Sequence, residues 1–182
     1  MCYRLETERL LIRRLDRSDM PAFLPLLNEW DVARTLGRVP HPYTEEMAQE
    51  FFDGLEKRRA AGEDFNFAIL RKSDREYLGG CGVFLRDDRP FELGYWIGKP
   101  YWGNGYATEA ARAAVQLAMV ELKVTKLIAG WFVDNPASGR VLEKLGFVAD
   151  GIEQRDCVAR GHAVACNKMV LTPELFGVKE AA

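Results

Sequence analysis

Apolar residues recur at helical spacing in four parts of the chain, and capping residues mark where two of these parts begin. Ser18 can cap a short helix that runs to about Asn28. Thr44 can cap a second helix, because Glu45 and Glu46 in its first turn suit the positive end of a helix dipole. The predicted helices cover residues 18–28, 44–59, 106–122 and 137–145.

Outside these helices the apolar period changes to two, which is typical of strands with one buried face. Turn-forming runs such as Asp87-Asp88-Arg89-Pro90 separate three of the segments and predict an antiparallel meander. The predicted strands cover residues 10–12, 65–69, 77–86, 91–97, 126–133, 147 onward and 164–171. Helices alternate with strands in the second half, so we expect an α+β or α/β single domain with a mixed sheet.

Length and composition agree with one globular domain and exclude several classes. The 182 residues are 48% hydrophobic, and 25 basic residues nearly balance 27 acidic ones. No basic stripe stands out, so nucleic acid is not an expected partner. No apolar run approaches the ~20 residues of a membrane span, and no signal core follows Met1. Four scattered cysteines and two histidines offer no zinc spacing, so we expect a cytoplasmic protein without a metal.

Two glycines, Gly103 and Gly105, precede the helix predicted over 106–122. Backbone N–H groups at such a helix start can hold a phosphate, although a tight turn that merely needs glycine explains them equally well. A dinucleotide loop would need Gly or Ala where Thr108 stands, and the acidic residue of the next strand comes only at Asp134. No Gly-Lys-Ser/Thr follows either, so both common phosphate-binding loops are excluded.

Four segments carry a resemblance to one protein family. They are residues 7–13, 92–97, 102–107, and 135–138 together with 143–147. In this order they resemble the GNAT superfamily of acyl-CoA-dependent N-acyltransferases, most closely the branch with the ribosomal-protein N-terminal acetyltransferases. The resemblance implies a single GNAT-fold domain over residues 5–171, with a mixed, mostly antiparallel sheet flanked by helices, and a short tail at 172–182.

The family's pyrophosphate loop reads Gln/Arg-x-x-Gly-x-Gly/Ala. Here it aligns with Trp102-Gly103-Asn104-Gly105-Tyr106-Ala107, in which Trp102 stands in place of Gln or Arg. The resemblance implies acetyl-CoA as the co-substrate. It also implies cofactor contacts from these six residues and from Trp96, Ile97, Asn135 and Ser138. Asn135 can alternatively act only as the cap of the helix that Pro136 opens.

The resemblance also points to residues that would carry the reaction. Glu92, on the strand that should border the acceptor site, is the candidate general base, with a plain strand glutamate as the equal alternative. Ser138 matches a family position proposed to protonate the leaving thiolate, although a serine at a helix start is explained equally well by its local bonding. His41 and Tyr43 lie in a loop near where the family admits its acceptor. The segment 156–162 matches the family poorly, and no residue is carried over from it.

The acceptor is predicted from amine chemistry. A lysine-type amine with a pKa of ~10.4 is neutral in about 1 of 2,500 molecules at pH 7, whereas an α-amine near ~7.8 is neutral in roughly one of seven. With only a weak candidate base, this chemistry favours an α-amine, and the resemblance to the ribosomal-protein N-terminal acetyltransferases implies the α-amine of a protein or peptide N-terminus. The alternatives are a small-molecule amine or an amino acid, and a non-catalytic CoA-binding module. A monomer and a homodimer are both compatible with the sequence.

Overall fold

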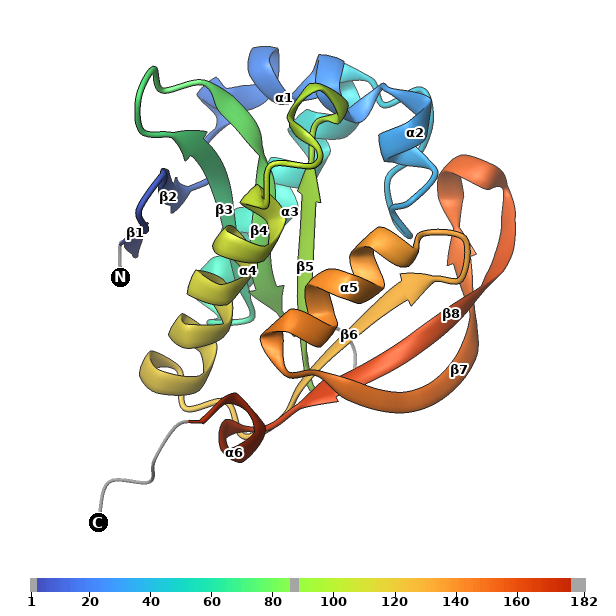
Figure 1. The fold of residues 1–182 in the computed structure, drawn as a ribbon. Helices are drawn as coiled ribbons and strands as arrows, with labels where there is room; N and C mark the ends of the chain where they lie inside the picture. Colours follow the sequence, from blue (N-terminus) through green and yellow to red (C-terminus); the bar gives the residue numbers. More distant parts are fainter. Residues whose placement is uncertain (1–2, 86–88, 178–182) are drawn as a thin grey trace.

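The computed structural model describes residues 3–85 and 89–177, which form one mixed sheet with helices on both faces (Figure 1). The strands are β1 (Arg4–Glu6), β2 (Leu10–Arg14), β3 (Asp64–Arg71), β4 (Tyr77–Phe84), β5 (Phe91–Ile97), β6 (Leu127–Phe132), β7 (Val148–Cys157) and β8 (His162–Leu171). Their order is β1-β2-β3-β4-β5-β6-β8-β7. All neighbours are antiparallel except β5 and β6, which are parallel. The predicted mixed, mostly antiparallel sheet is therefore confirmed.

The four predicted helices are present at the predicted places, and the described residues contain two further short helices. They are α1 (Met20–Leu27), α2 (Trp30–Ala33), α3 (Glu45–Ala60), α4 (Tyr106–Gln116), α5 (Pro136–Leu145) and α6 (Pro173–Phe176). A π-helical turn, Leu117–Glu121, continues α4, and 3-10 turns cover Arg17–Asp19, Lys99–Tyr101 and Val158–Arg160. The short elements β1, α2 and α6 had not been predicted, because three or four residues show no measurable period.

The helix caps confirm one prediction and correct another. The Thr44 side chain accepts a hydrogen bond from the backbone N–H of Met47, as expected of the cap of α3. Ser18 is not the cap of α1. Asp16 accepts from the N–H of Ser18 instead, and Asp19 bonds back to the N–H of Asp16. Asp16 therefore caps the 3-10 turn Arg17–Asp19 that leads into α1, two residues before the predicted cap.

Two apolar layers hold the helices to the sheet. One layer joins β2–β6 and β8 to α4 and α5, and the other joins β2–β4 to α1, α2 and α3. The alanines of α4 and its π turn, Ala110, Ala111, Ala114 and Ala118, are fully buried. Their small side chains let α4 approach the sheet closely, which places its N-terminus beside the end of β5 (Figure 1).

The sheet opens between β5 and β6. These two strands pair only at Phe91–Leu127 and Glu92–Ile128. Beyond this point β5 stays paired with β4 as far as Ile97, while β6 stays paired with β8 as far as Phe132. The sheet therefore splits into two limbs, and the gap opens toward the starts of α4 and α5.

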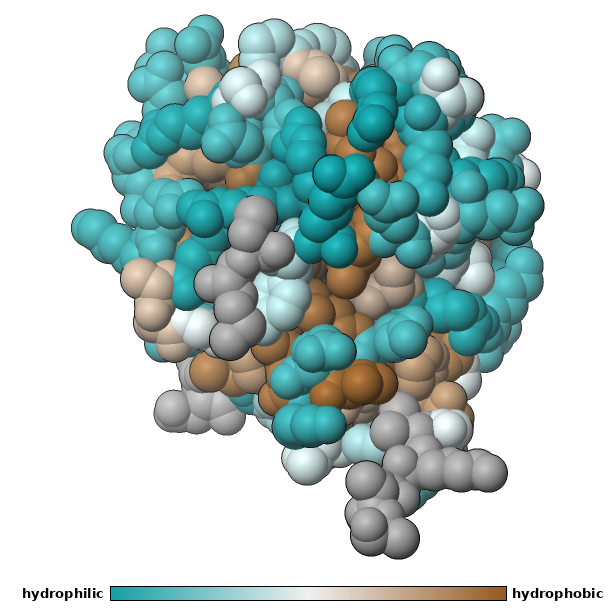
Figure 2. All heavy atoms as spheres, turned by 90° about the vertical axis from the view of Figure 1, so that its left-hand side faces the viewer, coloured by the Kyte–Doolittle hydropathy of each residue, from teal (hydrophilic) through white to brown (hydrophobic). Residues whose placement is uncertain are grey.

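Within residues 3–85 and 89–177, no helix is both long and apolar enough to cross a membrane. Figure 2 shows the face to the left of Figure 1, where polar side chains surround a band of apolar atoms. Parts of three predictions lie outside the described residues: the last residue of the strand at 77–86, the turn at 87–88 and the tail at 178–182.

Candidate active site

The glycine turn before α4 has an open surface. Gly103 and Gly105 have φ angles of +78° and +80°, a region that side chains disfavour. A Cβ atom at Gly103 would meet nothing within 4 Å, and one at Gly105 would meet only the tip of Arg9 at 3.5 Å. The glycines are thus required by backbone conformation and not by crowding. Because Gly105 is the N-cap of α4, no side chain caps its first-turn N–H groups.

The two large side chains of the turn hold the turn itself. Trp102 Nε1 donates to the Ile97 carbonyl at 2.6 Å. Asn104 Nδ2 donates to the carbonyls of Tyr101 and Trp102 at 3.1 and 3.0 Å. These bonds explain how Trp102 can stand where a Gln or Arg was expected. They also leave backbone N–H groups as the means by which this turn can bind an anion.

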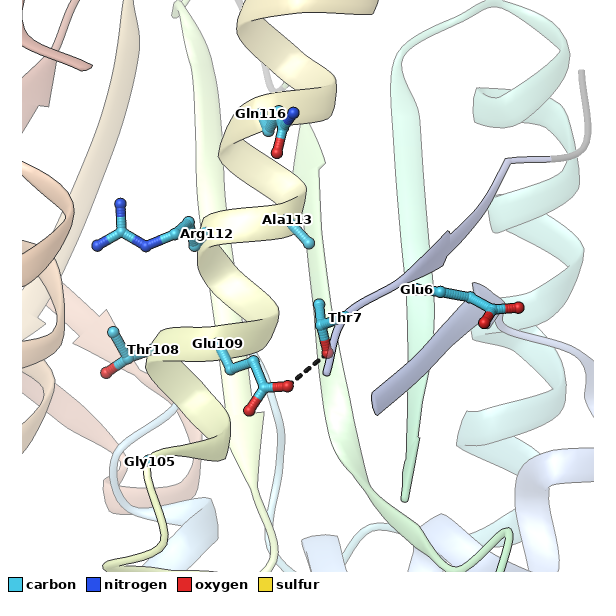
Figure 3. Close-up of a pocket in the computed structure, with 8 residues that line it drawn as sticks. All are labelled: Glu6, Thr7, Gly105, Thr108, Glu109, Arg112, Ala113 and Gln116. Atoms are coloured by element: carbon cyan, nitrogen blue, oxygen red, sulfur yellow. Dashed lines mark hydrogen bonds between the residues drawn. The ribbon is translucent and has the colours of Figure 1, made fainter. Parts of the chain in front are cut away.

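The turn between β1 and β2 braces the start of α4. Glu109 accepts from Thr7 Oγ1, from the Arg9 backbone N–H and from Arg9 Nε. Arg9 also donates to the Asn104 carbonyl at 3.0 Å. Figure 3 shows Thr7 directed at Glu109 on one side of α4, with Thr108 and Arg112 pointing to the other side. These four residues line an open groove of about 480 Å³. Burial raises the pKa of Glu109, but its bonds to Thr7 and Arg9 outweigh burial and lower it.

The candidate base, Glu92, is buried and ion-paired. Its Oε1 accepts from Arg155 Nη1 at 2.5 Å, and only 7% of the residue is exposed. Arg155 also contacts Glu153 at 2.7 Å. Its side chain passes over Gly130, where a Cβ atom would lie 3.1 Å from Arg155 Nη1. Burial lowers the pKa of Arg155, but the two carboxylates outweigh burial and raise it. Arg155 had not been singled out in the sequence.

The candidate acid, Ser138, meets a tyrosine that was not among the predicted site residues. The Tyr95 hydroxyl lies 2.8 Å from Ser138 Oγ and 3.0 Å from the Ser138 carbonyl oxygen. Tyr95 and Ile97 belong to the apolar layer of α4 and α5. Trp96 belongs to the opposite layer, with its ring 6.2 Å from that of Tyr77. A contact of Trp96 with a ligand on the α4 and α5 side would therefore use its backbone.

Asn135 and Pro136 start α5 as predicted, but the asparagine side chain does not cap the helix. Its backbone N–H donates to the Phe132 carbonyl at 2.7 Å, and its carbonyl accepts from the N–H of Ser138. The carboxamide thus makes no capping bond. This geometry favours a ligand contact for Asn135 over the alternative of pure capping.

His41 and Tyr43 lie in the loop between α2 and α3. His41 Nε2 is 3.1 Å from the Asn28 carbonyl, and its ring packs edge-on against Trp30. Tyr43 exchanges two backbone hydrogen bonds with the Asn28 side chain. Burial raises the pKa of Tyr43 to about 12. Among the described residues, no hydrogen bond joins either residue to Glu92 or Ser138, and their contact with an acceptor stays a prediction.

The α2 segment is anchored to both limbs of the split sheet. Asp31 pairs with Lys99, just after β5, at 2.8 Å. Arg34 pairs with Asp134, just after β6, at 3.4 Å, and Arg160 reaches the same Asp134 at 2.9 Å. The α2 segment therefore spans the gap between the ends of β5 and β6. Its buried Val32 packs in the apolar layer of α1 and α3, on the opposite face of the sheet from α4 and α5.

Comparison with known proteins identifies this arrangement. The family model for the acetyltransferase (GNAT) domain matches residues 9–148. The chain belongs to the GNAT acetyltransferase family. This membership confirms the resemblance seen in the sequence, and it gives the class of the enzyme: an acetyl-CoA-dependent N-acetyltransferase.

Three relatives illustrate the family. YoaA, an uncharacterized N-acetyltransferase of Bacillus subtilis, is 29% identical over 153 residues, covering 81% of this chain and 84% of its own. RimL, a ribosomal L7/L12 α-N-protein acetyltransferase in complex with coenzyme A, has a TM-score of 0.80 at 18% identity, covering 93% of this chain and 98% of RimL. The spermidine N-acetyltransferase of Vibrio cholerae, in complex with CoA and spermine, has a TM-score of 0.79 at 18% identity, with coverages of 93% and 99%. The two structures show the shared fold.

Proposed function

We propose that this GNAT acetyltransferase acetylates an α-amine, that of a protein or peptide N-terminus, directly from acetyl-CoA. The observation that carries the proposal is the ion pair of Glu92 with Arg155 at 2.5 Å. A carboxylate that already accepts a hydrogen bond from a guanidinium has one oxygen occupied, and it is therefore less available to take a proton from an amine. An acceptor that is neutral in roughly one of seven molecules at pH 7 needs less help from a base than a lysine or a polyamine.

The glycine turn fits the pyrophosphate of acetyl-CoA. An added Cβ atom at Gly103 would meet nothing within 4 Å, and the first turn of α4 carries no side-chain cap. Backbone N–H groups from Gly103 to Ala107 would hold the phosphates. The freed edge of β5 and the Asn135 carboxamide would hold the pantetheine arm. When bound, acetyl-CoA supplies an activated acetyl group as a thioester.

The chain's own residues then have separate roles. Glu92 takes a proton from the acceptor amine, directly or through a water, and Arg155 holds the carboxylate in place. Ser138, in the first turn of α5, gives a proton to the departing thiolate. His41 and Tyr43 line the acceptor entrance beside the α2 segment. We further propose a cytoplasmic enzyme that acts as a monomer or a homodimer without a nucleic-acid or membrane partner.

A small-molecule amine is the second candidate acceptor. The fold shared with the spermidine N-acetyltransferase supports this candidate. The fold shared with RimL supports the α-amine in the same way. A thiol-release screen over N-terminal peptides, amino acids, polyamines and aminoglycosides separates the two. We expect peptides to have the highest kcat/KM. Polyamines as best substrates would contradict the α-amine proposal, and acetyl-CoA hydrolysis without any acceptor would indicate a non-catalytic CoA-binding module.

A further inference from the structure

One side-chain contact crosses the opening between the two limbs of the sheet. Tyr95 lies three residues beyond Glu92, which is the last residue of β5 paired with β6. Ser138 lies in the first turn of α5, the helix that follows β6. The hydrogen bond between their hydroxyl groups, 2.8 Å long, therefore ties the free part of β5 to the start of α5.

The Tyr95 hydroxyl has two possible acceptors on the same residue. Its oxygen lies 2.8 Å from Ser138 Oγ and 3.0 Å from the Ser138 carbonyl oxygen, but a tyrosine hydroxyl carries one proton. When Tyr95 donates to the carbonyl, Ser138 can donate its own proton to Tyr95. When Tyr95 donates to Oγ, the proton of Ser138 is left for another acceptor. The geometry allows both arrangements with little movement of heavy atoms.

We propose that Tyr95 is the positioning residue for Ser138: it fixes the serine hydroxyl and donates a hydrogen bond to Oγ while that oxygen gives its proton to the thiolate of coenzyme A. The inference rests on the proposed role of Ser138 as proton donor. In this step the O–H bond of Ser138 breaks as an S–H bond forms on the leaving group. Tyr95 stabilises the negative charge that remains on Oγ. Ser138 then regains a proton from solvent, and solvent receives the proton that the amine releases.

The surroundings of Tyr95 suit this role. Its side chain is packed in the apolar layer of α4 and α5, so the hydroxyl has a defined position. Burial raises the pKa of Tyr95, and the hydroxyl therefore keeps its proton at every pH at which the enzyme would be assayed. The hydroxyl is therefore a hydrogen-bond donor throughout this pH range.

The test compares four variants: Tyr95→Phe, Ser138→Ala, the double variant, and Tyr77→Phe as a matched control. Tyr77 is also a buried tyrosine, but it lies in the opposite apolar layer. We expect Tyr95→Phe to lower kcat about tenfold, as loss of one hydrogen bond in the transition state would, with KM for acetyl-CoA within twofold. Tyr77→Phe leaves kcat unchanged. The double variant is no slower than Ser138→Ala, because Tyr95 acts only through Ser138.

Two kinetic results specific to Tyr95 would overturn the inference. One is a double variant whose loss equals the product of the two single losses, which would mean that Tyr95 acts independently of Ser138. The other is a Tyr95→Phe variant that behaves like Tyr77→Phe. A Ser138→Ala variant with unchanged kcat would refute the proton-donor role, and the inference with it.

A crystal structure of the complex with coenzyme A gives a readout that does not depend on turnover. We expect Ser138 Oγ within hydrogen-bond distance of the sulfur, the Tyr95 hydroxyl still on Oγ, and a second Ser138 rotamer in the Tyr95→Phe complex. A Ser138 directed away from the sulfur would overturn the inference, whichever amine is acetylated. Failure of wild-type protein to acetylate any amine would refute the proposed function, and this structure would still decide the role of Tyr95.

Discussion

Arg155 Nη1 lies 2.5 Å from Glu92 Oε1, although β6 and β8 separate the two strands that carry these residues. Arg155 spans this distance because Gly130 of β6 has no side chain in its path. The ion pair balances the buried charge of Glu92 at the point where the pairing between β5 and β6 ends. Glu92 is therefore a structural partner of Arg155 as well as the candidate base.

Replacement of Arg155 should destabilise the fold. Arg155→Met leaves Glu92 buried without its cation, and we expect the free energy of unfolding at pH 7 to fall by about 3 kcal/mol, as for other broken buried pairs. Urea denaturation measures the change. The double variant Arg155→Met/Glu92→Gln should regain part of this loss. A double variant less stable than Arg155→Met would contradict the account of the pair.

The activity of Glu92→Gln should depend on pH in a defined way. If Glu92 only removes a proton from an α-amine with a pKa near ~7.8, the variant should be most impaired near pH 6 and approach wild type near pH 9. Initial rates of thiol release with one N-terminal peptide, measured from pH 6 to pH 9, test this. A variant that is inactive even at pH 9 would show that Glu92 does more than take that proton.

Most of the fold could be predicted from local sequence. The periods of apolar residues gave α3 and β5 within a residue or two, and Thr44 and Pro136 marked helix starts as expected. Beyond the three-stranded meander, the order of the strands was not predicted, because pairing joins residues far apart in the chain. The cap predicted at Ser18 was wrong because Asp16 and Ser18 are both good caps, and Asp16 caps the 3-10 turn that precedes α1.

The site was predictable where it is local and not where it is assembled. The glycine turn carries its own signal, since positive φ angles at Gly103 and Gly105 require glycine. Arg155 and Tyr95 carry no such signal. Their partners, Glu92 and Ser138, lie 63 and 43 residues away along the chain. Alternation along a strand puts Tyr95 and Glu92, three residues apart, on opposite faces of β5, but it does not say what each side chain meets.

Gly105 should be needed for coenzyme A binding beyond its effect on stability. Gly105→Val forces a β-branched residue to φ +80° and adds atoms where the phosphates would lie. Gly62→Val is the matched control, because Gly62 has φ +75° and open space at the end of α3. Both variants should lose about 1–3 kcal/mol of stability through backbone strain. In calorimetric titration only Gly105→Val should bind coenzyme A at least tenfold more weakly, and equal weakening in both would contradict the assigned site.

Glu109 should contribute to acid sensitivity. Its folded pKa is lowered, so its contribution to stability is present above the unfolded pKa of ~4.3 and is lost as pH falls through the folded value. Glu109→Gln should therefore be less stable than wild type at pH 7, with the difference shrinking below about pH 4. Urea denaturation from pH 7 to pH 3 measures it. A difference that stays constant over this range would argue against a carboxylate held by Thr7 and Arg9.

The acceptor is tested most directly by locating the acetyl group on a product. A peptide with a free N-terminus and one internal lysine offers both amines in one molecule, and an equimolar polyamine adds the competing small substrate. After incubation with acetyl-CoA and the wild-type enzyme, tandem mass spectrometry identifies which nitrogen is acetylated. The account predicts acetylation of the peptide α-amine, with the lysine side chain and the polyamine left largely unmodified. Acetyl groups found mainly on the lysine side chain or on the polyamine would contradict it.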